Sequence, residues 1–198
     1  MTYSIIGSGN IGSAVARQFA RKRINVVIAN TRGPDSLAAL AKELGSYVTP
    51  QTIQSAVKAD VVILAAPFTA IDVIAGSSSD WKGKIVVDAT NAIDFPAFTP
   101  TDLGGKPSSA VVAGKLPGAR VVKAFNTLPA AVLASDPTQT GGRRVAFLSG
   151  DDAEANSKIA SLLEQLGFAP INLGRIGAGG LLQQFGGPLA LQNLVKVG

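Results

Sequence analysis

The sequence predicts an α/β fold in which helices cover both faces of a doubly wound, mostly parallel sheet. Short apolar runs alternate with segments of helical period along the chain. The run at residues 61–64 is apolar at every position, as expected for a strand that is buried on both faces. A glycine cluster at residues 7–12 joins the first apolar run to the first helix, as in the opening turn of a βαβ unit.

The first half of the chain contains four expected strands, at residues 3–6, 26–28, 61–64 and 84–90. A helix begins at Asn10, because Ile11, Val15 and Phe19 recur at intervals of four and form one buried stripe. A second helix covers residues 34–45, with a proline in its first turn and a glycine past its end. A third helix covers residues 70–76.

The second half continues the alternation after a loop at residues 95–107, which is rich in Pro, Gly and Ser. The expected elements are a helix at 109–116, strands at 119–125, 145–148 and 170–173, a helix at 152–166, and two helical pieces within 177–198. We therefore expect a Rossmann domain at residues 1–140 and a small α/β annex at residues 141–198.

The absence of two residue types limits the chemistry, because the 198 residues include no Cys and no His. Disulfides, thiol catalysis and a Ser-His-Asp site are excluded, and zinc, iron and copper sites lose their main ligands. Asp151 and Asp152 precede an expected helix, where capping is their ordinary role, since a hard cation requires about six oxygens or more. We expect no metal site.

The net charge of +5 and the mean hydropathy of +0.30 bear on partners and location. The basic residues form no long run, and the cluster at 17–23 is typical of a solvated helix end, so a small anionic ligand accounts for the charge better than nucleic acid. No apolar run approaches the roughly 18 residues of a membrane helix, and the first strand directly follows Met1. We expect a cytoplasmic protein that binds no membrane, and its apolar content favours a homodimer.

The glycine cluster reads G-S-G-N-I-G, which matches the dinucleotide-binding pattern G-x-G-x-x-G in its proper place between a strand and a helix. Gly7 permits the tight turn, Gly9 lets a pyrophosphate approach the backbone, and Gly12 lets helix and strand pack closely. Amides at the helix N-terminus then face the phosphates. The alternative is a purely structural turn. The predicted cofactor-binding residues of this turn are Gly7, Ser8, Gly9, Asn10, Ile11 and Gly12.

The second strand ends in Asn30, Thr31 and Arg32, where a site for NAD usually has Asp or Glu to hold the ribose hydroxyls. A carboxylate repels a 2′-phosphate, whereas a guanidinium beside a hydroxyl attracts it. We therefore predict that the cofactor is NADP, held at its 2′-phosphate by Thr31 and Arg32. Ser36 is expected to donate a further hydrogen bond. The alternative is that Arg32 is an ordinary surface residue.

Two further strands end in residues that are expected at the same edge of the sheet, where open α/β sheets bind ligands. Small side chains in the segment Ala65, Ala66, Pro67 and Phe68 would admit the cofactor past the backbone, although Pro67 could simply begin a helix. The next strand places Ala89 and Asn91 on that edge.

Six segments resemble a known family: IIGSGNIGSAVA, NTRGP, VVILAAPF, VVDATN, VVKAFNTLPA and LSGDDAEA. Over nearly its whole length the chain resembles the NADP oxidoreductases of the coenzyme F-420-dependent type, whose nucleotide domain is similar to that of the Steap metalloreductases. The resemblance implies a Rossmann domain with a small C-terminal annex, usually dimeric. It also implies hydride transfer between NADP(H) and a deazaflavin, coenzyme F-420, or a flavin.

By the same resemblance, Asn126, Thr127 and Pro129 line the cleft near the nicotinamide and the second ring, and Phe68 is grouped with them as a substrate residue. The annex is expected to complete this cleft. Hydride transfer between stacked rings requires proximity, orientation and exclusion of water, and the cofactors supply the electronics. We therefore predict no catalytic acid or base.

Two other functions remain open from the residues. An imine or β-hydroxyacid reductase shares the glycine pattern, but that class brings a long helical C-terminal domain and a catalytic Lys, for which the sequence after residue 142 offers no room. A non-catalytic NADPH-binding or sensor protein would bind the cofactor without turnover.

Overall fold

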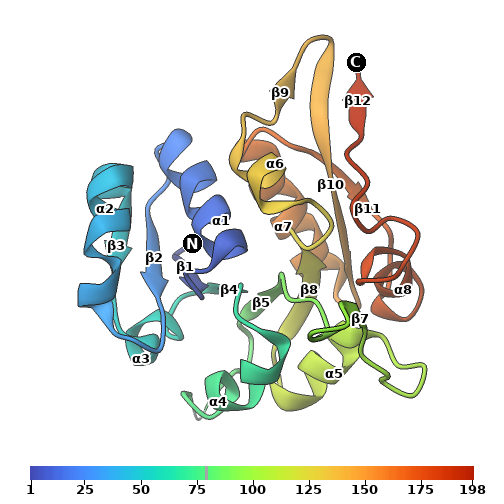
Figure 1. Cartoon of the computed structure of the whole chain (residues 1–198), viewed down its shortest axis with the longest axis horizontal. Coiled ribbons are helices and arrows are strands. Elements are labelled where there is room, and N and C mark those ends of the chain that lie inside the picture. The colour runs from blue at the N-terminus through green and yellow to red at the C-terminus, as the bar shows by residue number, and fades with distance from the viewer. Residues whose placement is uncertain (79) are drawn as a thin grey trace.

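A computed structural model describes residues 1–78 and 80–198, and within them a ten-stranded sheet forms the centre of the molecule (Figure 1). The eight strands of its main path follow the order β3-β2-β1-β4-β5-β8-β10-β11. These strands are Val48–Pro50 (β3), Val26–Ala29 (β2), Tyr3–Ile6 (β1), Val61–Leu64 (β4), Ile85–Asp88 (β5), Arg120–Ala124 (β8), Gly142–Gly150 (β10) and Ala169–Asn172 (β11). All neighbours are parallel except β8 and β10. The expected doubly wound Rossmann fold is therefore confirmed.

Helices cover both faces of the sheet (Figure 1). On one face lie Asn10–Arg21 (α1), Ala38–Leu44 (α2), Ala130–Ala134 (α6) and Ala153–Gln165 (α7). On the other lie Ile53–Ala56 (α3), Ile71–Ala75 (α4) and Ser108–Lys115 (α5). Short 3-10 turns occupy Pro34–Leu37, Gly45–Tyr47 and Phe68–Ala70, and a π-helical turn at Ile176–Gly180 leads into Leu181–Gln183 (α8).

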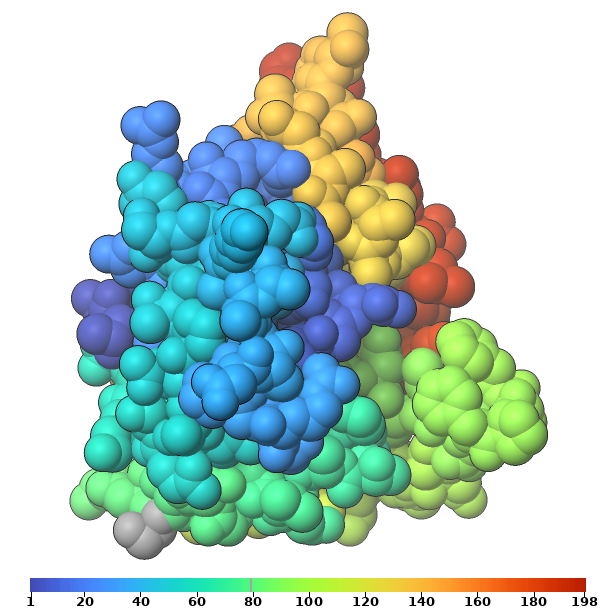
Figure 2. All heavy atoms as spheres, turned by 60° about the vertical axis from the view of Figure 1, so that its left-hand side comes forward, coloured from blue at the N-terminus to red at the C-terminus, as the bar shows by residue number. Residues whose placement is uncertain are grey.

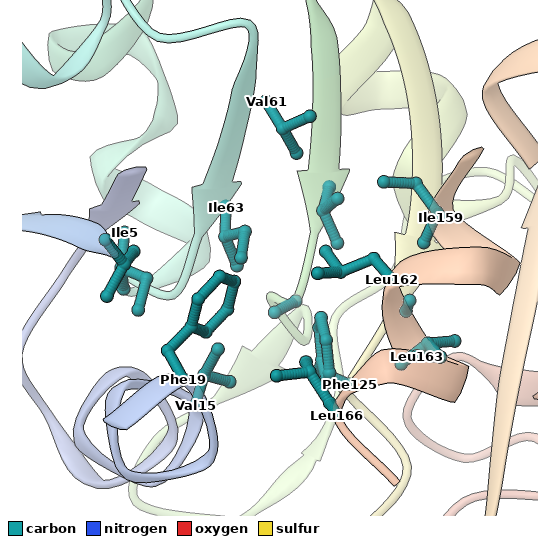
Figure 3. Packing of buried hydrophobic residues seen from close by; sticks show 14 of the residues in the cluster. Ile5, Val15, Phe19, Val61, Ile63, Phe125, Ile159, Leu162, Leu163 and Leu166 are labelled. Carbon is teal, nitrogen blue, oxygen red and sulfur yellow. The ribbon is translucent and has the colours of Figure 1, made fainter. Parts of the chain in front are cut away.

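The strands bury alternate side chains in two separate cores. Ile5 and Ile63 belong to the core under α1 and α7, whereas their neighbours Ile6 and Leu64 belong to the core under α3 to α5. Figure 3 shows side chains of α1 and α7, such as Phe19, pointing to the first of these cores. The apolar run 61–64 is therefore buried on both faces, as predicted.

The structure differs from the expected elements in the short strands. β3 was not expected, because its three residues include a proline, which an edge strand tolerates. The loop at 95–107 carries part of a hairpin formed by Ile93–Asp94 (β6) and Thr99–Pro100 (β7). Such pairs depend on neighbouring segments rather than on a local period.

The C-terminal segment also differs. The second of its two expected helical pieces is wrong, since the chain ends in the strand Val195–Val197 (β12), which pairs with β10, as does Thr138–Gln139 (β9). β10 and β11 extend the sheet of the first half, and α7 packs in the same core as α1. The sheet and this core therefore continue across residue 140, and the division into 1–140 and 141–198 stays a prediction.

No helix in residues 1–78 and 80–198 is both long and apolar enough to cross a lipid bilayer.

A buried ion pair joins β5 to β8 at the carboxyl end of the sheet. Asp88 and Lys123 are register partners with fully buried side chains, and Lys123 Nζ lies 3.1 Å from Asp88 Oδ2. The hydroxyls of Ser109 and Thr90 also donate to the carboxylate. Burial alone would raise the pKa of Asp88, but Lys123 and these hydrogen bonds lower it below its ordinary value. The carboxylate is therefore ionised at neutral pH.

We expect Lys123→Met to destabilise the fold by about 3–5 kcal/mol, because it leaves a buried carboxylate without its counter-charge. Urea unfolding at pH 7 measures this change in the free energy of unfolding. The double variant Asp88→Asn with Lys123→Met removes both charges and should lose less, while Lys42→Met, at an exposed lysine of α2, should stay within about 0.5 kcal/mol of the parent. Equal stability of the parent and Lys123→Met would contradict the assignment.

Candidate functional site

A cavity of about 470 Å³ lies at the carboxyl ends of β2, β1 and β4. Its volume falls within the range of ordinary small-ligand sites. The structure brings three predicted segments together in its walls: Gly7, Ser8 and Gly9; Asn30, Thr31 and Arg32; and Ala65, Ala66 and Pro67. Segments that are more than fifty residues apart in the sequence thus share one site.

The three glycines of the turn have different surroundings. Gly7 adopts a φ of +115°, and a side chain there would overlap the carbonyl of Ala65. A side chain at Gly12 would overlap the carbonyl oxygen of Gly7, so this glycine permits the helix to pack on the turn. Gly9 has nothing within 4 Å of where a Cβ would stand, and it lines the cavity. A ligand can therefore approach the backbone at Gly9.

The N-terminus of α1 opens beside this position. Gly9 is the N-cap residue, and no side chain caps the helix. The first amides of α1, including those of Asn10 and Ile11, consequently lack the intrahelical partners that later amides have. α1 is twelve residues long, and its uncapped N-terminus lies next to the open Gly9. This arrangement fits a pyrophosphate in shape, and the partial positive charge at the helix N-terminus complements the phosphate charge.

The loop after β2 is held by Asn30. Its Nδ2 donates to Ser8 Oγ at 2.8 Å and to Ser36 Oγ at 3.0 Å, and its Oδ1 accepts from the amide of Arg32 at 2.9 Å. Asn30 therefore ties the loop to the glycine turn. Thr31 and Arg32 are exposed at the cavity, and within residues 1–78 and 80–198 no carboxylate pairs with Arg32.

Ser36 lies outside the cavity lining. Its hydroxyl donates to the carbonyl of Gly33 at 2.7 Å, which supports the turn of the loop. Its hydrogen bond to a 2′-phosphate stays a prediction.

The ends of β5 and β8 form a second group beside this cavity. Asn91 and Asn126 bind each other, since Asn126 Nδ2 donates to Asn91 Oδ1 and Asn91 Nδ2 donates to the carbonyl of Asn126, each at 3.0 Å. Asn126 Nδ2 also donates to the carbonyl of Gln183 at 2.7 Å, which brings in the C-terminal segment. Ala89 is buried, and the carbonyl of the buried Thr127 accepts from the amide of Leu191 at 2.8 Å.

Two of the predicted substrate residues, Phe68 and Pro129, neither line the nucleotide cavity nor take part in the hydrogen bonds of Asn91 and Asn126 in the described part of the chain. Phe68 begins the turn before α4 and packs against the core under α3 to α5. Pro129 is exposed and caps the start of α6. Their roles at a substrate stay predictions.

Sequence reasoning missed five cavity residues, which come from β1, α3, the turn before α4 and α4 itself: Ile6, Ile53, Ala70, Val73 and Ile74. Their pattern is that of ordinary core residues, so no local signal separates them. The side chain of Val73 is 65% exposed, which is unusual for a valine. Its exposure is explained by its position in the apolar wall of the cavity, where the cavity opens to solvent.

Of the acidic pair before α7, Asp152 caps this helix as predicted, whereas Asp151 contacts the segment 175–176 instead. Asp152 Oδ1 accepts from the amide of Ala155 at 2.7 Å, and Asp151 Oδ1 accepts from the amide of Ile176 at 3.2 Å. Within the described part of the chain, no group of three or more His, Cys, Asp or Glu could hold a metal ion.

The chain is similar to known proteins in sequence and in structure. A family model described as NADP oxidoreductase, coenzyme F-420-dependent, matches residues 2–92. The metalloreductase STEAP3 of Rattus norvegicus is 30% identical over 176 residues, which are 88% of this chain and 34% of that protein. The chain therefore spans about a third of the length of this curated relative.

Two crystal structures are similar over most of both chains. A hypothetical protein of Sinorhizobium meliloti, SMa0349, has a TM-score of 0.97 and 54% identity, covering 99% of this chain and 96% of that one. A candidate F-420-dependent NADP reductase of an Arthrobacter species has a TM-score of 0.73 and 28% identity, covering 89% and 86%.

The glycine geometry predicts that two similar substitutions affect different properties, the stability of the fold at Gly12 and cofactor binding at Gly9. Gly12→Ala should destabilise the fold by about 1–3 kcal/mol, because the methyl group overlaps the Gly7 carbonyl. Gly9→Ala should cost about 1 kcal/mol or less in stability yet weaken NADPH binding, because its methyl group enters the cavity. Thermal unfolding and NADPH titration measure the two effects. Unchanged NADPH affinity in Gly9→Ala would show that the pyrophosphate does not approach this backbone.

Proposed function

The chain belongs to the NADP oxidoreductases described as coenzyme F-420-dependent, and from that membership we propose that it transfers a hydride between NADP(H) and a deazaflavin or flavin ring. The observation that carries the proposal is the cavity at the ends of β2, β1 and β4. It combines an open glycine turn, an uncapped helix start and an arginine that has no carboxylate partner within the described residues.

Different residues of the chain would bind different parts of NADP. Gly9 and the first amides of α1 would hold the pyrophosphate. Thr31 and Arg32 would hold the 2′-phosphate, and Asn30 keeps their loop in place through its bond to Ser8. The apolar wall around Val73 suits an adenine ring.

The bound cofactor supplies the hydride chemistry, so the protein has to orient the rings and exclude water. The reciprocal amide pair of Asn91 and Asn126 fixes both side chains at the ends of β5 and β8. Asn126 Oδ1 is buried and has no partner in the described part of the chain, which leaves it available to a ligand N–H group. Phe68, Thr127 and Pro129 complete the proposed surroundings of the second ring. No side chain is assigned a proton-transfer role.

Location in the cytoplasm and a homodimer are part of the same proposal. The dimer is supported by exposed apolar residues of the C-terminal segment, such as Leu191 and Val197. Sedimentation as a monomer at micromolar concentration would contradict it.

Arg32→Ala should weaken NADPH binding far more than NADH binding, by the roughly 1.5–3 kcal/mol of a lost charge-assisted hydrogen bond. Titration of both cofactors against the parent and the variant measures the difference. Thr69→Ala, at another exposed residue before α4 that lies outside the cavity lining, should leave both affinities unchanged. Equal weakening of both cofactors by Arg32→Ala would refute the 2′-phosphate assignment.

The hydride transfer itself is tested by stopped-flow mixing of the protein and NADPH with oxidised coenzyme F-420, FAD or FMN. We expect rapid loss of nicotinamide absorbance with at least one of these acceptors. Tight NADPH binding without oxidation by any of them would favour a sensor protein instead.

A further inference from the structure

A cavity of about 520 Å³ lies at the amino ends of the parallel strands β1, β4, β5 and β8. Residues that precede or begin these strands line it, together with Lys158 of α7. The nucleotide cavity lies at the carboxyl ends of β2, β1 and β4, so the two cavities are at opposite edges of the sheet and share no lining residue. Figure 2 shows this separation, because the first residues of the chain, in violet, and the lobe near residue 100, in light green, which follows β5, lie on opposite sides of the view.

Positive charge predominates in the lining of this cavity, which we call the basic cavity. Its charged side chains are those of Lys82, Lys84, Arg120 and Lys158 and one carboxylate, Asp60. The amide and the hydroxyl of Thr2 donate to Asp60 at 2.7 and 3.0 Å and lower the pKa of this carboxyl, so it is ionised at neutral pH. One negative charge therefore faces four cations.

Strand pairing holds these residues close together. The carbonyl of Lys84 accepts from the amide of Arg120 at 2.9 Å, and the carbonyl of Asp60 accepts from the amide of Ile85 at 3.0 Å. The side chain of Arg120 is only 26% exposed, and its guanidinium donates to the carbonyl of Gly83 at 3.0 Å. The guanidinium is thus fixed by the fold rather than free in solvent.

One neighbouring carboxylate, Glu154 of α7, serves two of the four cations. It lies 3.0 Å from Arg120 Nη1 and 2.5 Å from Lys158 Nζ. Within residues 1–78 and 80–198, Lys82 and Lys84 form no ion pair, and Lys84 Nζ donates only to the carbonyl of Ala59, at 3.3 Å. The described part of the chain therefore does not offset the repulsion among these cations.

Charge and volume indicate the class of ligand. A cleft lined by charges of one sign raises the local concentration of counter-ions. A guanidinium carries five N–H groups and pairs well with the oxygens of a phosphate or carboxylate, and Arg120 uses one at Glu154 and one at Gly83. The volume lies within the range of small-ligand sites, which favours a molecule with several anionic oxygens over a single small ion.

We propose that the basic cavity is a second ligand site, and that it binds a small molecule with two or more negative charges on phosphate or carboxylate groups. Lys82, Lys84 and Arg120 bind the oxygens of this anion. Glu154 competes with it for Arg120 and Lys158. No residue of the nucleotide cavity takes part, so the site is independent of the proposed function.

Calorimetric titration of the full chain with pyrophosphate and with citrate, at low salt and with saturating NADPH, tests the site. NADPH keeps pyrophosphate away from the glycine turn. We expect Lys82→Met and Lys84→Met each to weaken binding about fivefold, as the loss of one partly exposed ion pair predicts. Lys42→Met removes the same charge from an exposed position outside this cavity and should leave the affinity unchanged.

Glu154→Gln provides a test of opposite sign. It removes the competing carboxylate and frees two cations, so it should strengthen binding about fivefold although it removes two ion pairs from the protein. Glu164→Gln makes the same change in charge at an exposed position of the same helix and should have no effect. A general dependence on net charge would instead strengthen binding equally in both variants.

Saturable binding of either probe with these changes supports the site, and the tighter probe identifies the preferred group as phosphate or carboxylate. Equal affinities in Lys82→Met, Lys84→Met and Lys42→Met would overturn it, as would the absence of binding of both probes to the parent. Binding of polyglutamate without binding of pyrophosphate or citrate would overturn the restriction to small molecules. The substituted residues lie at the edge opposite to the nucleotide cavity, so their effects are measured whether or not NADPH binds.

Discussion

The buried ion pair of Asp88 and Lys123 constrains the arrangement of the carboxyl edge of the sheet, because both charged groups are removed from water when β5 and β8 pair. Neither charge is tolerable alone in this interior, so the two strands must meet in the register that places them together. Lys123 Nζ also donates to the carbonyl of Thr90 at 3.1 Å, and its own carbonyl accepts from Gln183 at 3.0 Å. The pair thereby fixes the loop after β5 and the C-terminal segment relative to one another.

Recognition at the nucleotide cavity uses backbone geometry more than side chains. Gly7 and Gly12 permit a turn in which any larger residue would overlap a carbonyl, and the same compactness brings the start of α1 to the end of β4. Side chains enter chiefly at the loop after β2, where Asn30 holds the loop and Arg32 stays without a carboxylate partner in the part of the chain that the structure describes. This division suits a protein without His, because orientation of bound rings requires fixed geometry and no titrating group.

Two cavities lie along one edge of the sheet, and different parts of the chain form them. Strands of the first half form the nucleotide cavity, whereas a smaller cavity exists only where the segment 92–108 meets α8. Asn126 connects these regions, since its Nδ2 binds both Asn91 and the carbonyl of Gln183. A displacement of the C-terminal segment would therefore alter this smaller cavity and the end of β8 together.

The sequence by itself determined the α/β class, most strands and helices of the sheet, and the glycine turn with Asn30, Thr31 and Arg32, because these features depend on local period and on residue types at short spacing. Tertiary structure alone decided that β10 pairs antiparallel with β8, that β3 forms the edge of the sheet and that the C-terminal segment forms the strand β12. Strand pairing of this kind depends on the neighbouring segments and not on a local sequence period. Tertiary structure also decided the Asp88–Lys123 pair, the wall residues around Val73 and the smaller cavity. Each of these joins residues that lie far apart in the chain, and their contacts exist only once the sheet has brought the segments together.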